Sequence, residues 1–119
     1  MFEKNLLLPC LLDIYGALLT DRKRELLDYY YEEDYSLSEI SELTGISRQG
    51  IRDSIKKSEA ELLDFESKLH LYEKKKAMAS ITADTRRSID STLAQAEDKR
   101  LEALLSGVYA RLDALEELI

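Results

Sequence analysis

The strongest pattern in the chain is a stripe of apolar residues at helical spacing between residues 48 and 74. Alternating steps of four and three residues place this stripe on one face of a helix. Its seven positions are Ile51, Ile55, Ser58, Leu62, Phe65, Leu69 and Tyr72. The pattern predicts one long helix from Arg48 to about Lys74. Because the preceding domain is too small to cover that length, we expect the far half to meet the C-terminal helix or a second copy of the chain.

Two shorter helices are predicted before this stripe. Pro9 suits the first position of a helix, because the amide that proline lacks would have no intrahelical partner there. Apolar residues at helical spacing continue this helix to Leu19. Thr20 can cap a second helix with its hydroxyl, and an apolar face carries that helix to Tyr31. The acidic run at 32–34 opposes the helix dipole and ends it.

The apolar run at residues 6–12 belongs to the first of these helices. It is far shorter than the ~20 apolar residues that span a bilayer, so we expect no membrane insertion. Cys10 lies in this run and is the only cysteine, so no intrachain disulfide can form. We expect Cys10 to be an inert core thiol in a protein of the reducing cytoplasm.

A helix-turn-helix is predicted for residues 36–57. Ser36 and Glu39 match the S-x-x-E capping box, and a short helix from about Leu37 to Leu43 follows it. Three of its residues are expected to turn inward: Leu37, Ile40 and Leu43. These positions suit the first of two crossed helices.

The turn of this motif is equally well marked. Gly45 stands where the backbone needs the left-handed conformation, and Ser47 is a natural cap for the next helix. The small Ser41 occupies the point where the two helices approach each other closely.

Beyond the long stripe, the pattern weakens from Ala77 to Ala83, which predicts a hinge or a loosely packed helix start. A last amphipathic helix is then outlined from Ile89 to Ile119. The prediction is therefore an all-α protein. It has a helix-turn-helix domain at 1–75 with a long fourth helix, followed by a C-terminal helical extension at 76–119 that is a candidate for dimerisation.

Composition and charge limit the range of possible functions. The chain of 119 residues contains only 4 Gly and 1 Pro, which suits a helical fold. Its net charge of −7 argues against strong nonspecific binding to nucleic acid, whose affinity comes largely from neutralised phosphates. The stretch at 36–58 is nevertheless the least acidic part of the folded core, which keeps nucleic-acid binding open.

The sequence contains no arrangement typical of catalysis. His70 is the only histidine, so a zinc site of the HExxH type is absent. The four glycines are isolated and form no phosphate-binding loop, and the carboxylates lie among Lys and Arg as on solvated helix faces. We therefore predict a non-enzymatic protein without metal or cofactor.

Candidate binding residues lie at the start of the fourth helix, where helix-turn-helix proteins contact base edges and phosphates. They are Arg48, Gln49, Arg52, Lys56 and Lys57. Arg pairs well with guanine and Gln with adenine. Against this, Gly50 weakens the first helical turn and Asp53 adds a negative charge to the same face. The alternative is a three-helix fold used for protein contacts, with these side chains merely solvated.

Several separate segments resemble the YlxM family in order and spacing, over roughly residues 10–75. They are YGALLT at 15–20, YYY at 29–31, SLSEI at 36–40, GISRQ at 45–49, Asp53, Ile55, Lys56, Glu59 and the ending at 68–73. The resemblance implies a helix-turn-helix similar to region four of sigma factors. It also implies DNA binding, and a role in the signal recognition particle pathway.

Two functions follow as hypotheses. In the first, a dimer presents two helix-turn-helix modules to DNA or to the RNA of the signal recognition particle. In the second, the chain binds proteins and modulates the GTPases of that pathway, using charged surfaces around Arg86 and Arg87 or at 97–117. The net charge of −7 and the long amphipathic helices favour the second.

Overall fold

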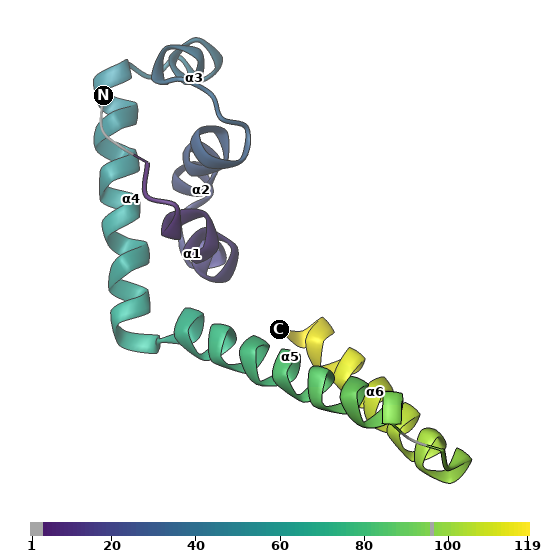
Figure 1. Cartoon of the computed structure of the whole chain (residues 1–119). Coiled ribbons are helices and arrows are strands. Elements are labelled where there is room, and N and C mark those ends of the chain that lie inside the picture. Colours follow the sequence, from purple (N-terminus) through teal and green to yellow (C-terminus); the bar gives the residue numbers. More distant parts are fainter. Residues whose placement is uncertain (1–3, 96) are drawn as a thin grey trace. The chain divides into compact units, whose positions relative to one another are not determined.

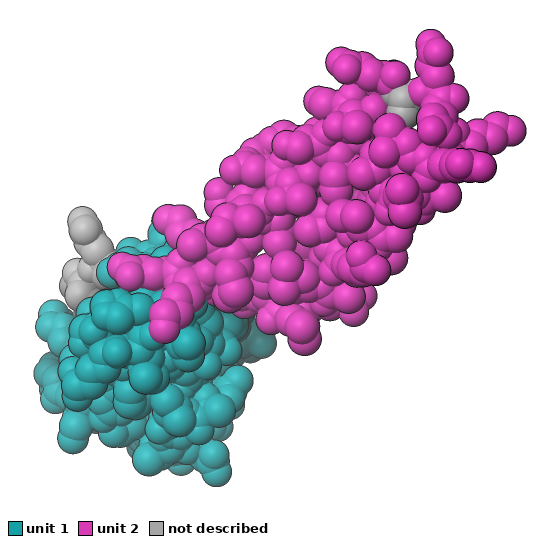
Figure 2. All heavy atoms as spheres, turned by 90° about the horizontal axis from the view of Figure 1, so that it is seen from below, with its two compact units in different colours: residues 1–72 teal, residues 73–119 magenta. Residues whose placement is uncertain are grey.

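The structure is a computed structural model, which describes residues 4–95 and 97–119. The described residues form α-helices and contain no β-strand (Figure 1). The helices are α1 (Leu7–Tyr15), α2 (Asp21–Leu27), α3 (Leu37–Thr44), α4 (Arg48–Leu69), α5 (Leu71–Gln95) and α6 (Lys99–Leu118). The predicted all-α fold is confirmed. The chain divides into two compact units, residues 1–72 and residues 73–119 (Figure 2).

The first helix differs from its prediction at both ends. Asn5 Oδ1 accepts a hydrogen bond from Leu7 N at 3.0 Å, so α1 begins two residues before Pro9. Proline is tolerated at this third position because the first amides of a helix have no intrahelical acceptor. The helix ends at Tyr15 instead of Leu19, and a 3-10 turn (Gly16–Leu18) follows.

The second helix starts as predicted. Thr20 Oγ1 accepts a hydrogen bond from Lys23 N at 3.3 Å and caps α2. After α2 the chain widens into a π-helical turn (Asp28–Glu32). Lys4, in the segment before α1, contacts this turn: its Nζ donates a hydrogen bond to Tyr30 O at 2.8 Å.

The helix-turn-helix forms as its capping pattern predicts. Ser36 Oγ accepts from Glu39 N at 3.1 Å, and Glu39 Oε1 accepts from Ser36 N at 3.3 Å, which completes the capping box. Gly45 has the expected left-handed backbone with φ of 76°. Ser41 Oγ then donates to Ile46 O at 2.6 Å across the turn. Ser47 Oγ caps α4 by accepting from Gly50 N at 3.1 Å.

The core of the first unit forms where α4 meets α1, α2 and α3. Its buried apolar residues are Leu8, Leu11, Leu12, Tyr15, Leu19, Leu26, Leu27, Tyr30, Ile40, Ile51, Ile55 and Leu62. Phe65 and Tyr72 pack against the same core, and the rings of Phe65 and Tyr15 are 5.8 Å apart. The expectation that the far half of α4 lacks a partner within its own domain is therefore wrong, because α1 covers it.

Three residues expected to be buried are exposed instead. On α1 the buried face consists of Leu8, Leu11, Leu12 and Tyr15, which leaves Cys10 exposed on the opposite side. On α3 the inner face runs from Leu37 through Ile40 to Thr44, so Leu43 points outward and is 60% exposed. Leu69 is 45% exposed because the helix ends there.

The long helix predicted to reach Lys74 is interrupted. It ends at Leu69, and His70 adopts the left-handed conformation with φ of 54°. Tyr15 Oη donates to Glu66 Oε1 at 2.6 Å and accepts from Leu71 N at 3.1 Å. Glu66 Oε1 also accepts from Tyr72 N at 2.9 Å. These bonds satisfy the first amides of α5, so a separate helix can begin there.

The second unit is a hairpin in which α6 returns alongside α5 (Figure 1). Of the two alternatives for 77–83, the hinge is wrong, because α5 runs through this stretch without a break. Loose packing near the start of the helix fits better, since residues 77–81 are exposed and the first buried residue of α5 is Thr82. The single helix predicted from Ile89 to the C-terminus is also wrong. Its interruption is explained by Asp98, whose Oδ1 caps α6 by accepting from Arg100 N at 2.8 Å.

No helix among the described residues combines the length and the apolar character needed to cross a membrane.

Candidate nucleic-acid interface

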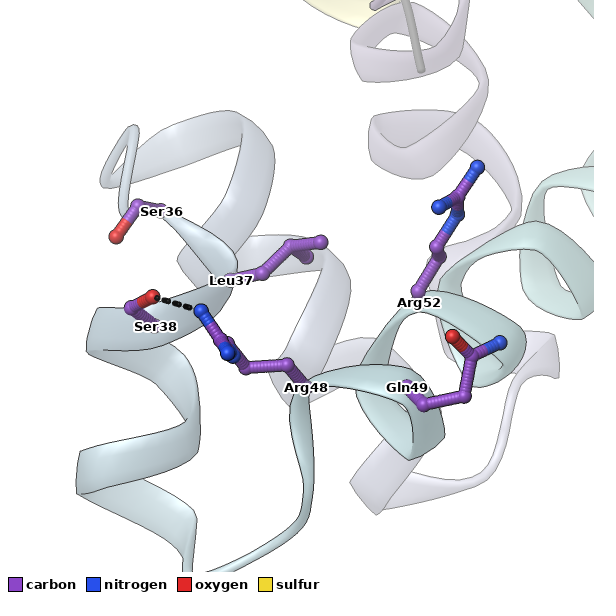
Figure 3. Close-up of a pocket in the computed structure, with 6 residues that line it drawn as sticks. All are labelled: Ser36, Leu37, Ser38, Arg48, Gln49 and Arg52. Atoms are coloured by element: carbon purple, nitrogen blue, oxygen red, sulfur yellow. Dashed lines mark hydrogen bonds between the residues drawn. The ribbon is translucent and has the colours of Figure 1, made fainter. Parts of the chain in front are cut away.

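A hollow of about 570 Å³ opens between the first turns of α3 and α4 (Figure 3). It is lined by Ser36, Leu37, Ser38, Arg48, Gln49 and Arg52. The capping box starts α3 at one wall, and the Ser47 cap starts α4 at the other. The helix-turn-helix therefore brings two helix N-termini, which carry partial positive charge, to the same surface.

Two arginines give this hollow its chemistry. Arg48 is exposed and reaches across to α3, where its Nη1 lies 3.4 Å from Ser38 Oγ (Figure 3). Arg52 follows one helical turn later and is half-buried. Leu37 lies between the two side chains in this view. Guanidinium groups keep their charge at all physiological pH values and match the geometry of phosphate oxygens, so the hollow suits an anion with several oxygens.

Gln49 is held on its own helix. Its Nε2 donates to Asp53 Oδ1 at 2.9 Å, one turn along α4. Such an exposed pair stabilises a helix by only about 0.2–0.5 kcal/mol, so a ligand can displace it at small cost. Before Gln49 can read a base, however, this pair must open and the Asp53 carboxylate must be tolerated beside the ligand.

The remaining predicted residues lie farther along the same helix. Lys56 and Lys57 are both exposed on α4, one to two turns beyond Arg52, and neither lines the hollow. Of the five predicted residues, the structure thus gathers Arg48, Gln49 and Arg52 in one place. The lysines extend the basic character of α4 along its solvent side.

The contribution of α3 to the hollow was not predicted from the sequence. Ser36, Leu37 and Ser38 form one wall of the hollow. Their signal was present, because the capping box fixes these residues as the first turn of a helix that must approach the next one.

Gly50 has a structural role that its helix propensity does not show. A Cβ atom at this position would lie 3.1 Å from both Ile46 Cγ2 and Ser47 Oγ. Glycine therefore allows the first turn of α4 to pack closely against the turn and its cap. The residue that weakens the helix in isolation thus avoids a tight contact with these two side chains.

The fold and this site define the class of the molecule: it is a helix-turn-helix protein. The sequence profile of UPF0122, described as "Putative helix-turn-helix protein, YlxM / p13 like", matches residues 2–103. The chain therefore belongs to the UPF0122 family, and the resemblance to YlxM proteins is confirmed.

Curated relatives cover nearly the whole chain. A UPF0122 protein of Thermoanaerobacter sp. (strain X514) is 36% identical over 115 residues, which are 97% of this chain and 98% of the relative. One of Shouchella clausii is 37% identical over 118 residues, 99% of each chain. One of Oceanobacillus iheyensis is 50% identical over 74 residues, 62% of this chain and 70% of the relative.

Proposed function

We propose that this protein is a non-enzymatic regulator that binds nucleic acid through its helix-turn-helix. The observation that carries the proposal is the hollow lined by Arg48 and Arg52 between two helix N-termini. Phosphate contacts of this kind position a helix-turn-helix on a duplex, and side chains such as Gln49 then reach base edges. Lys56 and Lys57 are placed to add phosphate contacts along the same helix.

The proposed ligand is DNA or the RNA of the signal recognition particle, bound in the cytoplasm. The family resemblance supports a role in that targeting pathway, and the helix-turn-helix supports duplex DNA. The acidic surroundings limit nonspecific binding, since residues 1–72 contain 9 Lys and Arg against 15 Asp and Glu. We expect affinity to depend on the few basic groups at the hollow and to fall steeply with salt.

The experiment compares two variants of equal charge. Binding of duplex DNA and of the particle's RNA is measured by fluorescence anisotropy between low and moderate salt. Arg48→Gln with Arg52→Gln should weaken binding about tenfold or more and reduce the salt slope by about one per lost phosphate contact. Lys99→Gln with Arg100→Gln removes the same charge from exposed positions of α6 and should have little effect. Negligible binding of both nucleic acids without a salt slope contradicts the proposal.

The second candidate function is a protein-binding module that modulates the GTPases of the pathway. The net charge of −7 favours it. Arg86, however, links the two helices of the hairpin: its Nη2 lies 2.6 Å from Asp113 Oδ1 and 3.2 Å from Glu116 Oε1, and its Cζ lies 5.1 Å from the centre of the Tyr109 ring. Changing Arg86 would disturb the hairpin itself. Charge changes at exposed positions of 97–117 are the cleaner test, and partner binding should then survive Arg48→Ala with Arg52→Ala.

We also propose that the protein is a homodimer, although not through the stripe of α4. That stripe is covered by α1, whereas the hairpin leaves a set of large apolar side chains exposed: Met78, Ile81, Leu104, Leu115 and Leu118. Two such hairpins could bury these residues as a four-helix bundle. Dimerisation would present two helix-turn-helix modules to one ligand.

Light scattering of the full chain at micromolar concentration tests this proposal. The wild type should have twice the mass of one chain, and Ile81→Glu with Leu104→Glu should shift it to the monomer. Ala60→Glu, at an exposed position of α4, is a control that should leave the mass unchanged. A monomeric wild type contradicts the proposed dimer.

A further inference from the structure

A second surface of the first unit is separate from the arginine hollow and is lined mainly by carboxylates and tyrosines. It consists of two adjoining hollows of about 260 Å³ and 310 Å³. The larger is lined by Tyr35, Glu39, Glu42 and Leu43, and the smaller by Asp21, Arg24, Glu25, Asp28, Tyr29 and Glu33. We call the two together the tyrosine surface. It shares no lining residue with the arginine hollow.

A stacked pair of tyrosines joins the two hollows. The rings of Tyr29 and Tyr35 have centroids 5.7 Å apart and an interplanar angle of 24°. The pair is fixed from the backbone, because Tyr35 N donates to Tyr29 O at 2.9 Å. Tyr29 Oη also donates to Glu25 Oε1 at 3.2 Å. The aromatic centre of this surface is therefore held in place before any ligand arrives.

Leu43 extends this aromatic centre with an aliphatic side chain. It lines the same hollow as Tyr35 and is 60% exposed, although the rest of the apolar residues on α3 face the core or its edge. The exposed leucine and the accessible aromatic ring form an apolar area that remains exposed after folding. A partner protein can bind to this area. Contact with an apolar side chain of a partner would cover it.

The charge around this apolar centre is strongly negative. Six carboxylates line the two hollows: Asp21, Glu25, Asp28, Glu33, Glu39 and Glu42. Arg24 is the one basic residue in either lining, and its Nε lies 4.0 Å from Asp28 Oδ2. Among the described residues, neither Glu33 nor Glu42 forms an ion pair. Just outside the linings, Arg22 Nη1 lies 3.0 Å from Glu25 Oε2 and offsets that carboxylate. The six carboxylates still outnumber these two arginines, so the rim keeps a net negative charge.

We propose that the tyrosine surface binds a basic, amphipathic segment of a partner protein. An apolar side chain of the segment contacts Tyr35 and Leu43, while its Lys or Arg residues pair with carboxylates such as Glu33 and Glu42. Complementary charge at the rim speeds and orients such an encounter, and the apolar centre supplies the buried contact. Nucleic acid does not fit, because the carboxylates repel phosphates. The protein would then carry a nucleic-acid face and a protein face on one helix-turn-helix unit.

The test uses the full chain and a fluorescent synthetic peptide that forms an amphipathic helix of lysine and leucine. Binding should be measurable at low salt and should weaken as salt rises. Peptides with Glu in place of Lys, or with Ser in place of Leu, should not bind. Glu33→Lys with Glu42→Lys should weaken binding of the basic peptide about tenfold. The matched control is Asp13→Lys with Asp90→Lys, which makes the same charge change at exposed positions that line neither hollow and should have little effect.

Other variants separate the alternatives. Leu43→Ser leaves the net charge unchanged and should weaken peptide binding about fivefold. If thermal unfolding shows that Glu33→Lys with Glu42→Lys is destabilised, Leu43→Ser is used in its place. Arg48→Gln with Arg52→Gln should leave peptide binding unchanged, so this proposal can fail while nucleic-acid binding stands. Equal losses in the double variant and its control would show an effect of net charge alone and overturn the proposal. So would a dimeric wild type that becomes monomeric on Glu33→Lys with Glu42→Lys, because a second copy would then occupy the surface.

Discussion

The two units contain long amphipathic helices of similar length that are buried to very different extents. In the first unit α4, with 22 residues, buries Ile51, Ile55, Ser58 and Leu62. In the second unit α5, with 25 residues, buries only Thr82 and Ile89. The difference is in the number of neighbours. Three helices pack against one side of α4, whereas α5 has the single helix α6 beside it within its unit.

This comparison shows that amphipathic spacing alone does not give a core. Helices gain most of their stability in proteins from burying an apolar face. Two helices alone leave much of each apolar face in contact with solvent. The hairpin is held partly by ion pairs of Arg86 with Asp113 and Glu116, whose carboxylates are well exposed. Exposed ion pairs contribute about 0–1 kcal/mol each. We therefore expect the first unit to carry the stability of the chain and the second to be marginal until it associates.

The largest expected effect is on the core of the first unit. Ile55→Ala removes a fully buried side chain and should lower the free energy of unfolding by about 3 kcal/mol. Ile89→Ala, at the hairpin interface, should cost only about 1 kcal/mol, because a two-helix interface can collapse around the missing atoms. Urea unfolding followed by circular dichroism measures both values. Equal losses would mean that the hairpin is as well packed as the first unit.

The next effect concerns the junction between α4 and α5. Tyr15→Phe removes the hydroxyl that donates to Glu66 and accepts from Leu71 N. Because the lost bond involves a carboxylate and an amide loses its acceptor, we expect a loss of about 2 kcal/mol. Tyr29→Phe removes a more exposed phenol that also bonds a carboxylate and should cost less than half as much. If Tyr15→Phe lowers the free energy of unfolding by no more than Tyr29→Phe does, the hydrogen bonds at the junction contribute little to stability.

Local signals in the sequence were enough to predict the helix-turn-helix. The capping box at Ser36, the glycine at position 45 and the cap at Ser47 each act within a few residues, and all three were confirmed. The stripe predicted from Ile51 to Tyr72 is confirmed as a buried face of α4 as far as Leu62. These features depend on backbone hydrogen bonds and helical spacing, which can be recognised in a single sequence.

The features that were missed depend on distant contacts. The stripe continues through Leu69 to Tyr72 with unbroken spacing, so nothing local marks the break at His70. The bond that fixes it joins Tyr15 to Glu66, 51 residues apart. The wall that α3 adds to the arginine hollow likewise depends on how two helices meet. The exposure of Leu43 depends on which side of a short helix faces the core.

Alkaline pH should destabilise the first unit through its buried and half-buried tyrosines. Burial and a hydrogen bond to Glu59 raise the pKa of Tyr31, and burial raises the pKa of Tyr15 and Tyr30. The folded state then keeps these protons at a pH where the unfolded state has lost them. These tyrosines contribute their full stabilisation below pH 10.0, the ordinary pKa of tyrosine. Above that pH the free energy of unfolding falls by up to about 1.4 kcal/mol per pH unit for each group.

Urea unfolding at several pH values above 10.0 measures this decline. Tyr31→Phe should make the decline shallower, because one titrating group is removed. Glu59→Gln should also reduce it, since the carboxylate that raises the Tyr31 pKa is then gone. A decline of unchanged slope in both variants would show that Tyr31 does not contribute.

The smallest expected effect is a gain in stability at Ser58. This residue is the polar position in the stripe of α4, is fully buried, and its hydroxyl has no hydrogen-bond partner among the described residues. Ser58→Ala removes an unpaired buried hydroxyl and improves helix propensity, so it should raise the free energy of unfolding by about 1 kcal/mol. Ser67→Ala on the same helix is the control, because its exposed hydroxyl bonds to Asp64 O and its loss should change stability by less than about 0.5 kcal/mol. If Ser58→Ala destabilises the chain, the hydroxyl stabilises the core. The core of the first unit would then depend on a polar contact as well as on apolar burial.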